Sequence, residues 1–204
     1  PYSASKAASE LVIKSYRQSF CSKKAAPVLA SVRAGNVIGG GDWSEDRLIP
    51  DLARSLQTGT SLEIRSPDAV RPWQHVLECL SAYLLLGQQL LEGERQYAGA
   101  WNIGPDPGSN RSVSDILTQI HSFWPDFRWH VTDRIQPHET GVLYLDSARI
   151  RNQLGWKPVW GFSEGIIATA KWYRQFILND TIISREQLDQ YTEAAAGKSI
   201  WAEK

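Results

Sequence analysis

The chain opens with Pro1-Tyr2-Ser3-Ala4-Ser5-Lys6-Ala7-Ala8-Ser9-Glu10, which leads into a predicted helix over Ser5 to Phe20. Tyr2 and Lys6 stand four residues apart. A helix places two such side chains on one face, about 5 to 6 Å apart at Cβ. A phenol has a pKa of about 10 and is a weak base at neutral pH unless a positive charge lies beside it. The spacing therefore fits a tyrosine base assisted by Lys6, and it fits an exposed tyrosine beside a solvated lysine equally well.

Helix and strand patterns alternate along the rest of the chain. The apolar run Val28 to Val32 predicts a strand that ends at Arg33, and Asn36 to Asp42 predicts a glycine-rich loop. Arg47 to Leu56 predicts a helix entered through Ser44 and Glu45. Further strands are predicted over 62–65, 71–76 and 128–132, and further helices over 77–91, 113–124, 147–154, 163–177 and 185–195. This alternation indicates an α/β protein.

Local signals mark two of the predicted helix starts and the character of the last segment. Ser112-Val113-Ser114-Asp115 forms a capping box, and Phe162 with Ile167 fits a hydrophobic staple. Residues 181–204 are polar, so they are expected to form a tail with little core of its own, either an arm or a frayed end.

Composition excludes several classes of function. Lysine plus arginine equals aspartate plus glutamate at 22 each, so no general attraction to nucleic acid or to a membrane surface is expected. Cys21 and Cys79 are lone cysteines, which suits a cytoplasmic protein without disulfides. The four histidines show no metal-ligand spacing, and no apolar run approaches the roughly 18 residues of a membrane span. An anionic ligand would therefore require a local cluster of arginines.

Further segments follow the opening helix in a fixed order: Arg33-Ala34-Gly35-Asn36-Val37-Ile38-Gly39, Arg47-Leu48-Ile49-Pro50, Arg71-Pro72-Trp73-Gln74-His75-Val76, Trp101-Asn102-Ile103-Gly104 and Leu154-Gly155-Trp156-Lys157-Pro158. Together with Tyr2-Ser3-x-Ser5-Lys6 they resemble the extended short-chain dehydrogenase/reductase superfamily, in the branch that modifies nucleotide sugars. Within that branch, Gly39 to Trp43 and Arg71 to Glu78 are most similar to 4,6-dehydratases that act on CDP-glucose. The resemblance runs from Pro1 to about Phe176.

The resemblance implies the end of a Rossmann-type parallel sheet plus a smaller mixed α/β substrate-binding domain. Residues 1–60 would belong to the NAD-binding domain, 61–180 to the substrate-binding region, and 181–204 to the tail. Dinucleotide phosphates need a glycine-rich turn between the first strand and the first helix. Gly39-Gly40-Gly41 lacks that spacing and follows the wrong strand. We therefore expect the C-terminal part of a longer protein, which alone neither binds NAD tightly nor catalyses a reaction.

The resemblance also assigns roles in catalysis and cofactor binding. Tyr2 would take the proton of the sugar 4-hydroxyl while a hydride passes from C4 to NAD, and Lys6 would lower the pKa of Tyr2 and bind the nicotinamide ribose. The resulting ketone acidifies the C5 hydrogen, water leaves across C5 and C6, and the hydride returns to C6. The expected activity is that of a lyase, in deoxysugar and O-antigen biosynthesis, and no metal is expected.

The residues assigned to the nucleotide sugar are Asn36, Arg47, Leu48, Arg71, Arg33, Trp73 and His138. Arginine suits a diphosphate because its guanidinium group forms bidentate bonds. Several of these residues have plain structural alternatives: a turn residue for Asn36, an ion pair for Arg33 and a solvated loop for His138. Trp43 and Trp73 lie in segments matched to the substrate cleft, whereas most of the nine tryptophans are expected to fill the core.

Two other functions stay open at this point. One is a nucleotide-sugar 4-epimerase, or another dehydratase, of the same branch, and the other is a non-catalytic module that binds nucleotide sugars. The intact pair of Tyr2 and Lys6 argues against the second. The partners expected are a small nucleotide sugar and a second copy of the chain, because the dimer helix usual in this superfamily includes the segment Ser5 to Phe20.

Overall fold

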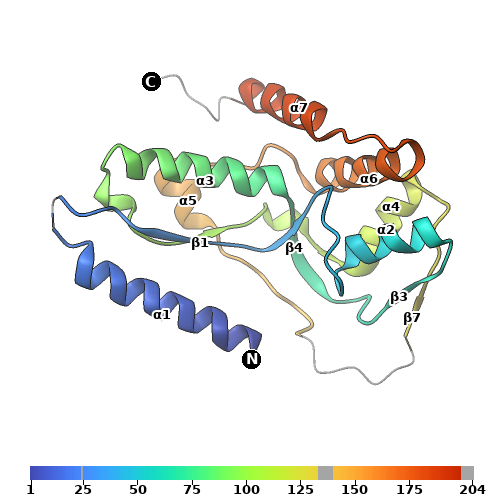
Figure 1. Ribbon diagram of the computed structural model, residues 1–204, viewed down its shortest axis with the longest axis horizontal. Helices are drawn as coiled ribbons and strands as arrows, with labels where there is room; N and C mark the ends of the chain where they lie inside the picture. Colours follow the sequence, from blue (N-terminus) through green and yellow to red (C-terminus); the bar gives the residue numbers. More distant parts are fainter. Residues whose placement is uncertain (24, 133–139, 199–204) are drawn as a thin grey trace.

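The computed structural model describes residues 1–23, 25–132 and 140–198 (Figure 1). The helices in these residues are α1 (Tyr2–Phe20), α2 (Leu48–Thr58), α3 (Val76–Leu91), α4 (Val113–Phe123), α5 (Ala148–Leu154), α6 (Phe162–Asn179) and α7 (Ser184–Gly197). The strands are β1 (Ala30–Ala34), β2 (Asn36–Ile38), β3 (Leu62–Ile64), β4 (Val70–His75), β5 (Gly99–Ile103), β6 (Asn110–Ser112) and β7 (Trp129–Val131). Each predicted helix is present, within a few residues at its ends.

Most of the strand pairing in the described residues is parallel. β1 pairs with β5, β2 with β4, and β3 with β7 in parallel, whereas β4 and β6 are antiparallel. Parallel neighbours require a crossover connection, which helices provide here. The predicted α/β class, with parallel strands, is therefore confirmed.

The glycine-rich segment differs from its prediction at its start. Residues 36–42 were expected to form a loop, but Asn36–Ile38 is strand β2, and Asn36 pairs with Trp73 of β4. Gly39, Gly40 and Gly41 suggested the loop, but they follow β2. Gly35, just before β2, allows β2 and β4 to pack closely. A Cβ on Gly35 would lie 2.6 Å from both Cγ and the carbonyl oxygen of Pro72, so a side chain there would push β2 away from β4.

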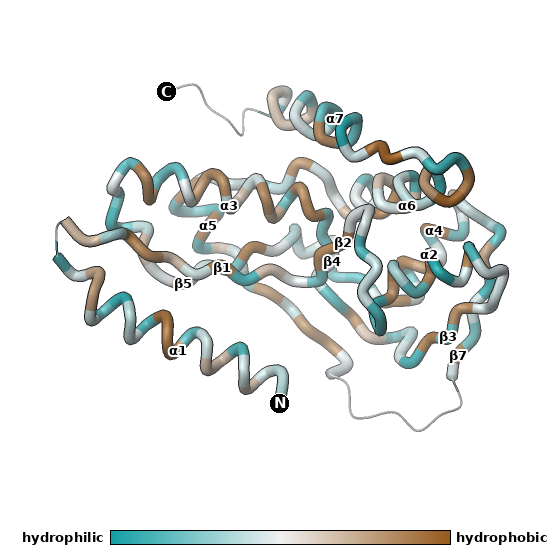
Figure 2. Tube along the Cα trace, in the orientation of Figure 1, coloured by the Kyte–Doolittle hydropathy of each residue, from teal (hydrophilic) through white to brown (hydrophobic). Residues whose placement is uncertain are grey.

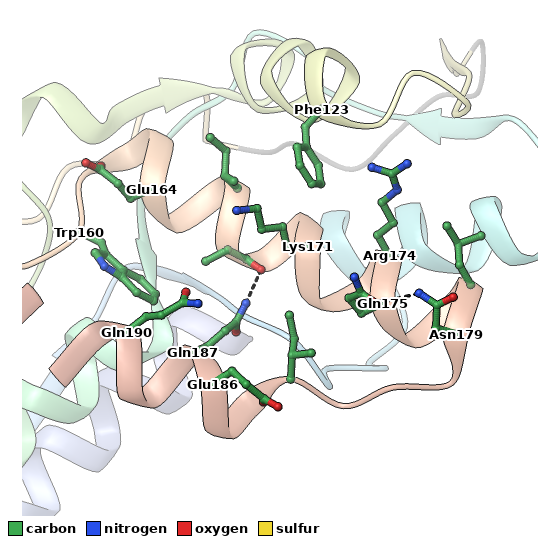
Figure 3. A pocket seen from close by; sticks show the side chains of 14 residues that line it. Phe123, Trp160, Glu164, Lys171, Arg174, Gln175, Asn179, Glu186, Gln187 and Gln190 are labelled. Atoms are coloured by element: carbon green, nitrogen blue, oxygen red, sulfur yellow. Dashed lines mark hydrogen bonds between the residues drawn. The ribbon is translucent and has the colours of Figure 1, made fainter. Parts of the chain in front are cut away.

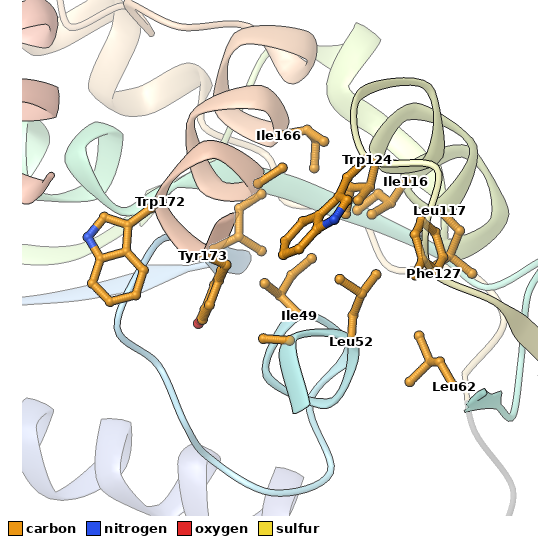
Figure 4. Packing of buried hydrophobic residues seen from close by; sticks show 14 of the residues in the cluster. Ile49, Leu52, Leu62, Ile116, Leu117, Trp124, Phe127, Ile166, Trp172 and Tyr173 are labelled. Atoms are coloured by element: carbon orange, nitrogen blue, oxygen red, sulfur yellow. The ribbon is translucent and has the colours of Figure 1, made fainter. Parts of the chain in front are cut away.

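Helices α2, α4 and α6 close over the main hydrophobic core, which Figure 4 shows. Its buried members include Ile49, Leu52, Ile116, Leu117, Trp124, Phe127, Ile166, Trp172 and Tyr173. A second core forms around Trp101, Ile103, Ile150 and Trp156, between β5, α3 and α5. The main core includes Ile38 of β2 and Trp73 of β4, and these two strands contribute Asn36 and Arg71 to the candidate site.

Two predicted helix starts have different outcomes. The capping box of α4 is confirmed, because Ser112 Oγ accepts from Asp115 N–H at 3.1 Å and Asp115 Oδ2 accepts from Ser112 N–H at 3.0 Å. The staple at α6 is wrong, because Phe162 is the first helical residue. Gly161 is the N-cap, and its N–H donates to Glu164 Oε2 at 3.0 Å. This carboxylate bond starts the helix one residue earlier than expected.

The segment after α6 is also more ordered than the sequence suggested. α7 buries Gln187, Tyr191 and Ala195 against the rest of the protein, so the expectation of a polar tail with little core is wrong for this helix. Figure 2 shows hydrophobic and hydrophilic positions mixed along α7, as they are along α1. The buried residues are spaced by four, and this spacing places them on one helix face.

Candidate active site

A cleft of about 850 Å³ lies where α1, β2, α2 and β4 come together. A cleft of this size is within the range typical of sites for small ligands. Six of the predicted site residues line it: Tyr2, Asn36, Arg47, Leu48, Arg71 and Trp73. The structure thus brings together side chains from four separate segments of the chain.

Tyr2 and Lys6 lie on the exposed face of α1. Tyr2 is 74% exposed, and its hydroxyl is available to a ligand in the cleft. The Lys6 Nζ lies 5.5 Å from the centroid of the Tyr2 ring, as helical spacing predicts. Lys6 is not among the residues that line the cleft and lies beside Tyr2.

Strand β4 supplies one wall of the cleft. Arg71 is only 9% exposed, and its guanidinium donates to the carbonyl oxygens of Val70 at 2.9 Å and Gly141 at 3.4 Å. Trp73 is buried, and its Nε1–H donates to the carbonyl oxygen of Arg111 at 2.9 Å. These bonds fix both side chains before any ligand arrives. Because Trp73 is buried, it offers the cleft no open stacking face.

Helix α2 points its N-terminus at the cleft. Arg47 is the N-cap residue rather than part of the helix as predicted, and its backbone is extended with φ −123° and ψ 135°. No side chain caps the first turn of α2. Free N–H groups at a helix N-terminus attract anions, and the exposed Arg47 guanidinium adds a full positive charge. Arg47 and the first turn of α2 can therefore hold a phosphate group.

Sequence reasoning missed three acidic residues in the cleft, Asp42, Glu45 and Asp46. Burial would raise the pKa of Asp42, but hydrogen bonds from Ser44 and the nearby charges of Arg47 and Arg54 outweigh it and lower that pKa. Asp46 has a left-handed backbone with φ 59° and forms an ion pair with Arg65. The five residues before Arg47 contain these three acidic residues, and this local cluster could have indicated them from the sequence. Their oxygens can accept hydrogen bonds from sugar hydroxyls or from an amino group.

Two expectations turn out differently, and a third is not tested. The Arg33 guanidinium lies 3.6 Å from Glu10 Oε1 and donates through Nε to Asn102 Oδ1 at 3.0 Å, so it joins α1, β1 and β5 instead of lining the cleft. Trp43 packs edge-on against Tyr173, with ring centroids 5.4 Å apart, and belongs to the core surface. His138 lies outside the described residues.

A smaller hollow of about 240 Å³ adjoins the cleft, with which it shares Asp46, Leu48 and Val113. Its other lining residues include Glu63, Arg65 and Ser66 from β3 and the turn after it. The shared residues make the two hollows one elongated site. A ligand with a compact ring at one end of a phosphate group could extend from the hollow into the cleft.

A separate groove of about 700 Å³ lies along α6, between α7 and the end of α4 (Figure 3). None of the predicted site residues lines it. The glycines at 39–41 do not form a phosphate cradle either, because a Cβ on Gly40 would lie 2.0 Å from the Trp172 ring. Within residues 1–23, 25–132 and 140–198 there is no cluster of ligating side chains for a metal, and no helix is long and apolar enough to cross a membrane.

The comparisons with known proteins agree on one family. The profile of the NAD dependent epimerase/dehydratase family matches residues 1–104. CDP-glucose 4,6-dehydratase of Salmonella typhimurium is 39% identical over 201 residues, which cover 95% of this chain and 56% of that protein. dTDP-glucose 4,6-dehydratase of the same organism is 27% identical over 177 residues, which cover 85% of this chain and 47% of that protein. The chain thus spans about half the length of these relatives.

Solved structures share the fold. UDP-glucuronic acid 4-epimerase from Bacillus cereus matches with a TM-score of 0.71 and 18% identity, over 86% of this chain and 53% of that one. dTDP-glucose 4,6-dehydratase from Bacillus anthracis matches with a TM-score of 0.67 and 20% identity, over 86% of this chain and 52% of that one. At these identities the likeness establishes the fold alone.

Proposed function

Because the chain belongs to the NAD-dependent epimerase/dehydratase family, we propose that it carries the substrate-binding part of a nucleotide-sugar 4,6-dehydratase that acts on CDP-glucose. The main support is the single cleft that gathers Tyr2, Asn36, Arg47 and Arg71. A tyrosine base and two guanidinium groups in one cleft match a substrate with a sugar hydroxyl and a diphosphate. The 39% identity to CDP-glucose 4,6-dehydratase supports the choice of substrate.

The residues of this chain fit one end of NAD. Tyr2 and Lys6 lie exposed on one helix face, where they can bind the nicotinamide ribose. The phosphates of NAD find no cradle at Gly39-Gly40-Gly41, because Trp172 occupies the space beside Gly40. NAD, when bound, takes up a hydride from the substrate and returns it, so the cofactor is not consumed overall.

The side chains of the chain handle the proton and the diphosphate. Tyr2 accepts the proton of the sugar 4-hydroxyl, and the Lys6 ammonium group lies beside its ring. Arg71 and Arg47 hold the diphosphate, while Asn36 donates a hydrogen bond near it. The overall reaction removes the 6-hydroxyl as water and leaves a ketone at C4 and a methyl group at C6.

The small hollow next to the cleft is proposed as the site of the base. Its volume of about 240 Å³ is sufficient for a pyrimidine base. Cytosine presents an amino donor where uracil and thymine present a carbonyl oxygen. Asp46 and Glu63 line the hollow. Their carboxylates already accept from Arg65 and Thr132, and each has a second oxygen that can accept from that donor. CDP-glucose should therefore be preferred over UDP-glucose, dTDP-glucose and GDP-mannose.

A side-by-side assay of 4-keto-sugar formation with these four nucleotides tests the proposal in a protein that contains this chain and a dinucleotide-binding part. The expected result is the greatest rate with CDP-glucose. Greatest activity with dTDP-glucose or GDP-mannose would keep a dehydratase and reject CDP. Formation of a 4-epimer without loss of water would indicate an epimerase, and binding without turnover would indicate a non-catalytic module.

We also propose that the protein forms a homodimer through α1. The helix buries none of its own residues, and Leu11, Val12, Tyr16 and Phe20 are all more than half exposed. An exposed apolar face of this kind is typical of a protein interface. Sedimentation of wild-type protein and of a Val12→Glu variant tests this: the variant should sediment as a monomer, and a wild-type monomer at all concentrations would exclude the dimer.

A further inference from the structure

A buried carboxylate joins three distant segments behind the cleft. Glu78, in the first turn of α3, is 1% exposed. It accepts hydrogen bonds from the N–H of Val159 at 2.9 Å, from the N–H of Trp160 at 2.7 Å and from the hydroxyl of Tyr191 at 3.0 Å. Burying a carboxylate is costly unless it is hydrogen-bonded. The three donors therefore have to stay together for Glu78 to remain buried as a charged group.

Aromatic packing reinforces the same junction. The ring of Trp160 lies between His75 and Tyr191, with centroid distances of 5.0 Å to each. The Tyr191 hydroxyl also lies 3.1 Å from Ser81 Oγ, which accepts from Trp156 Nε1–H at 3.0 Å. Edge-to-face rings add stability beyond the area they bury. Tyr191 is thus the point where α7 attaches to both α3 and the segment before α6.

The junction is continuous with the wall of the cleft. His75 is the last residue of β4, the strand that presents Arg71 and Trp73 to the cleft. The His75 Nδ1 accepts from the N–H of Leu77 at 3.3 Å and caps α3. The position of His75 thus depends on the ring of Trp160, which in turn is held by Tyr191. A change at Tyr191 can reach β4 through this short series of contacts.

Helix α7 has two further attachments that do not involve this junction. Trp172 Nε1–H donates to Ser184 Oγ at 2.8 Å, and Gln187 Nε2–H donates to the carbonyl oxygen of Ala168 at 2.6 Å, a bond visible in Figure 3. These bonds hold the start of α7 on α6. The end of α7 is also held by Lys198, whose Nζ donates to the carbonyl oxygen of Val159, and by the buried Ala195. Loss of the Tyr191 hydroxyl would therefore loosen the end of α7 without releasing the whole helix.

We propose that α7 is a clamp that holds β4 in the position needed to bind the nucleotide diphosphate, with Tyr191 and Glu78 as positioning residues. This inference rests on the proposed function of the cleft. The relative that acts on CDP-glucose matches 95% of the 204 residues, which leaves out about 10, fewer than the 14 residues of α7. At least part of α7 therefore belongs to the shared sequence.

Hydrogen exchange on the 204-residue chain tests the clamp directly. Tyr191→Phe removes the hydroxyl and keeps the ring, while Gln190→Ala changes an exposed neighbour on α7 as the matched control. We expect the amides of β4 and of the end of α7 to exchange at least about tenfold faster in Tyr191→Phe, with β3 unchanged. Faster exchange in α7 with no change in β4 would overturn the clamp.

Calorimetry with CDP gives the second readout. Tyr191→Phe should bind CDP roughly three- to tenfold more weakly than the wild-type chain, and Gln190→Ala should bind it equally well. Equal binding by all three would overturn the clamp while leaving the proposed function intact. No CDP binding by the wild-type chain would reject the proposed function, and the exchange of β4 would still decide the clamp. If Tyr191→Phe does not fold, Ser81→Ala provides a milder disturbance of the same hydroxyl with the same expected pattern.

Discussion

The first and last helices of the described chain, α1 and α7, are both rich in polar residues, yet their surroundings are opposite. α1 has 19 residues and buries none, whereas α7 has 14 and buries three. Each helix carries a tyrosine with a proposed role, Tyr2 as a base and Tyr191 as a positioning residue. Tyr2 is 74% exposed beside a lysine, while Tyr191 is 4% exposed beside the Glu78 carboxylate. Composition alone does not distinguish a helix that presents a reactive group from one that closes the fold.

The two tyrosines differ in their burial and in the charge of their nearest ionisable neighbour. Burial and the adjacent Glu78 charge raise the pKa of Tyr191 well above its ordinary value, so this phenol stays protonated and serves as a donor. Tyr2 has a cation close to its ring and solvent around it. Only Tyr2 is placed to exchange a proton with a ligand. The comparison therefore separates the proposed chemical role of α1 from the proposed structural role of α7, and the predictions below test these roles and the contacts that hold each helix.

The largest effect is expected from Tyr2→Phe. In a protein that contains this chain and shows dehydratase activity, turnover should fall by at least about 100-fold, because the proton acceptor is lost. The melting temperature should not change, since the side chain is exposed. Tyr16→Phe on the same helix is the matched control and should keep full turnover. Near-normal turnover of Tyr2→Phe would remove α1 from the chemistry.

The second prediction concerns the effect of low pH on stability through His75, which packs against Trp160 near α7. Burial lowers the pKa of His75 from 6.5 to about 4, so folding opposes its protonation. The contribution of His75 to stability is complete above pH 6.5 and is lost as the pH falls toward 4, by about 3 kcal/mol at most. Burial raises the pKa of Glu78, so the contribution of Glu78 to stability has the opposite pH dependence. It is present at low pH and is lost as the pH rises.

Urea unfolding between pH 7 and pH 4 measures this effect. His75→Asn keeps a side-chain acceptor for the N-terminus of α3 but does not titrate in this range. The free energy of unfolding of the wild-type chain should fall more steeply with acid than that of the variant. Parallel curves for the two proteins would show that the neutral state of His75 does not matter to the junction.

A third prediction concerns the packing of Gly40 against Trp172, the residue that contacts the start of α7. A Cβ on Gly40 would lie 2.0 Å from the ring of Trp172, whose Nε1–H donates to the first residue of α7. Gly40→Ala should therefore lower the free energy of unfolding by roughly 1 to 3 kcal/mol. Gly87→Ala, in an open position of α3, should raise it by up to about 1 kcal/mol. Equal effects of the two variants would exclude close packing as the reason for glycine at position 40.

The smallest effect is expected at the polar contact that ties α1 to the sheet. Glu10 accepts from Ser31 Oγ at 2.9 Å and pairs with the partly exposed Arg33. Glu10→Gln should lower the free energy of unfolding by roughly 0.2 to 1 kcal/mol, because solvent screens such a pair. Glu193→Gln, exposed on α7, is the control and should have no effect. A loss of several kcal/mol would mean that α1 is held more firmly than its exposure indicates.

Much of the cleft could be predicted because its residues lie in short segments that resemble, in the same order, those of the nucleotide-sugar branch of the extended short-chain dehydrogenase/reductase superfamily. Tyr2, Asn36, Arg47 and Arg71 each followed from such a segment, and the structure places all four around one cleft. Arg33 could not be assigned in the same way, since a guanidinium that faces a phosphate and one that faces Glu10 leave the same local pattern. The difference lies in a contact between two elements, which periodicity does not encode.

The burial of α7 was missed for a related reason. Its partner Glu78 lies 113 residues before Tyr191, so no local pattern links them. A usable signal was nevertheless present, because Gln187, Tyr191 and Ala195 recur every four residues and form one helix face. The many charged residues around them made the segment look like a tail. A short buried face is enough to fix a helix when it contains a tyrosine with a buried acceptor.

Calorimetric titration of the 204-residue chain with CDP and, separately, with NAD tests the central claim most directly. The groups proposed for the diphosphate lie in this chain, whereas no phosphate cradle for NAD forms at Gly39-Gly40-Gly41. We therefore expect CDP to bind, NAD not to bind at the same concentrations, and Arg71→Ala to weaken CDP binding by about 10- to 100-fold. Micromolar binding of NAD together with no binding of CDP would contradict the account.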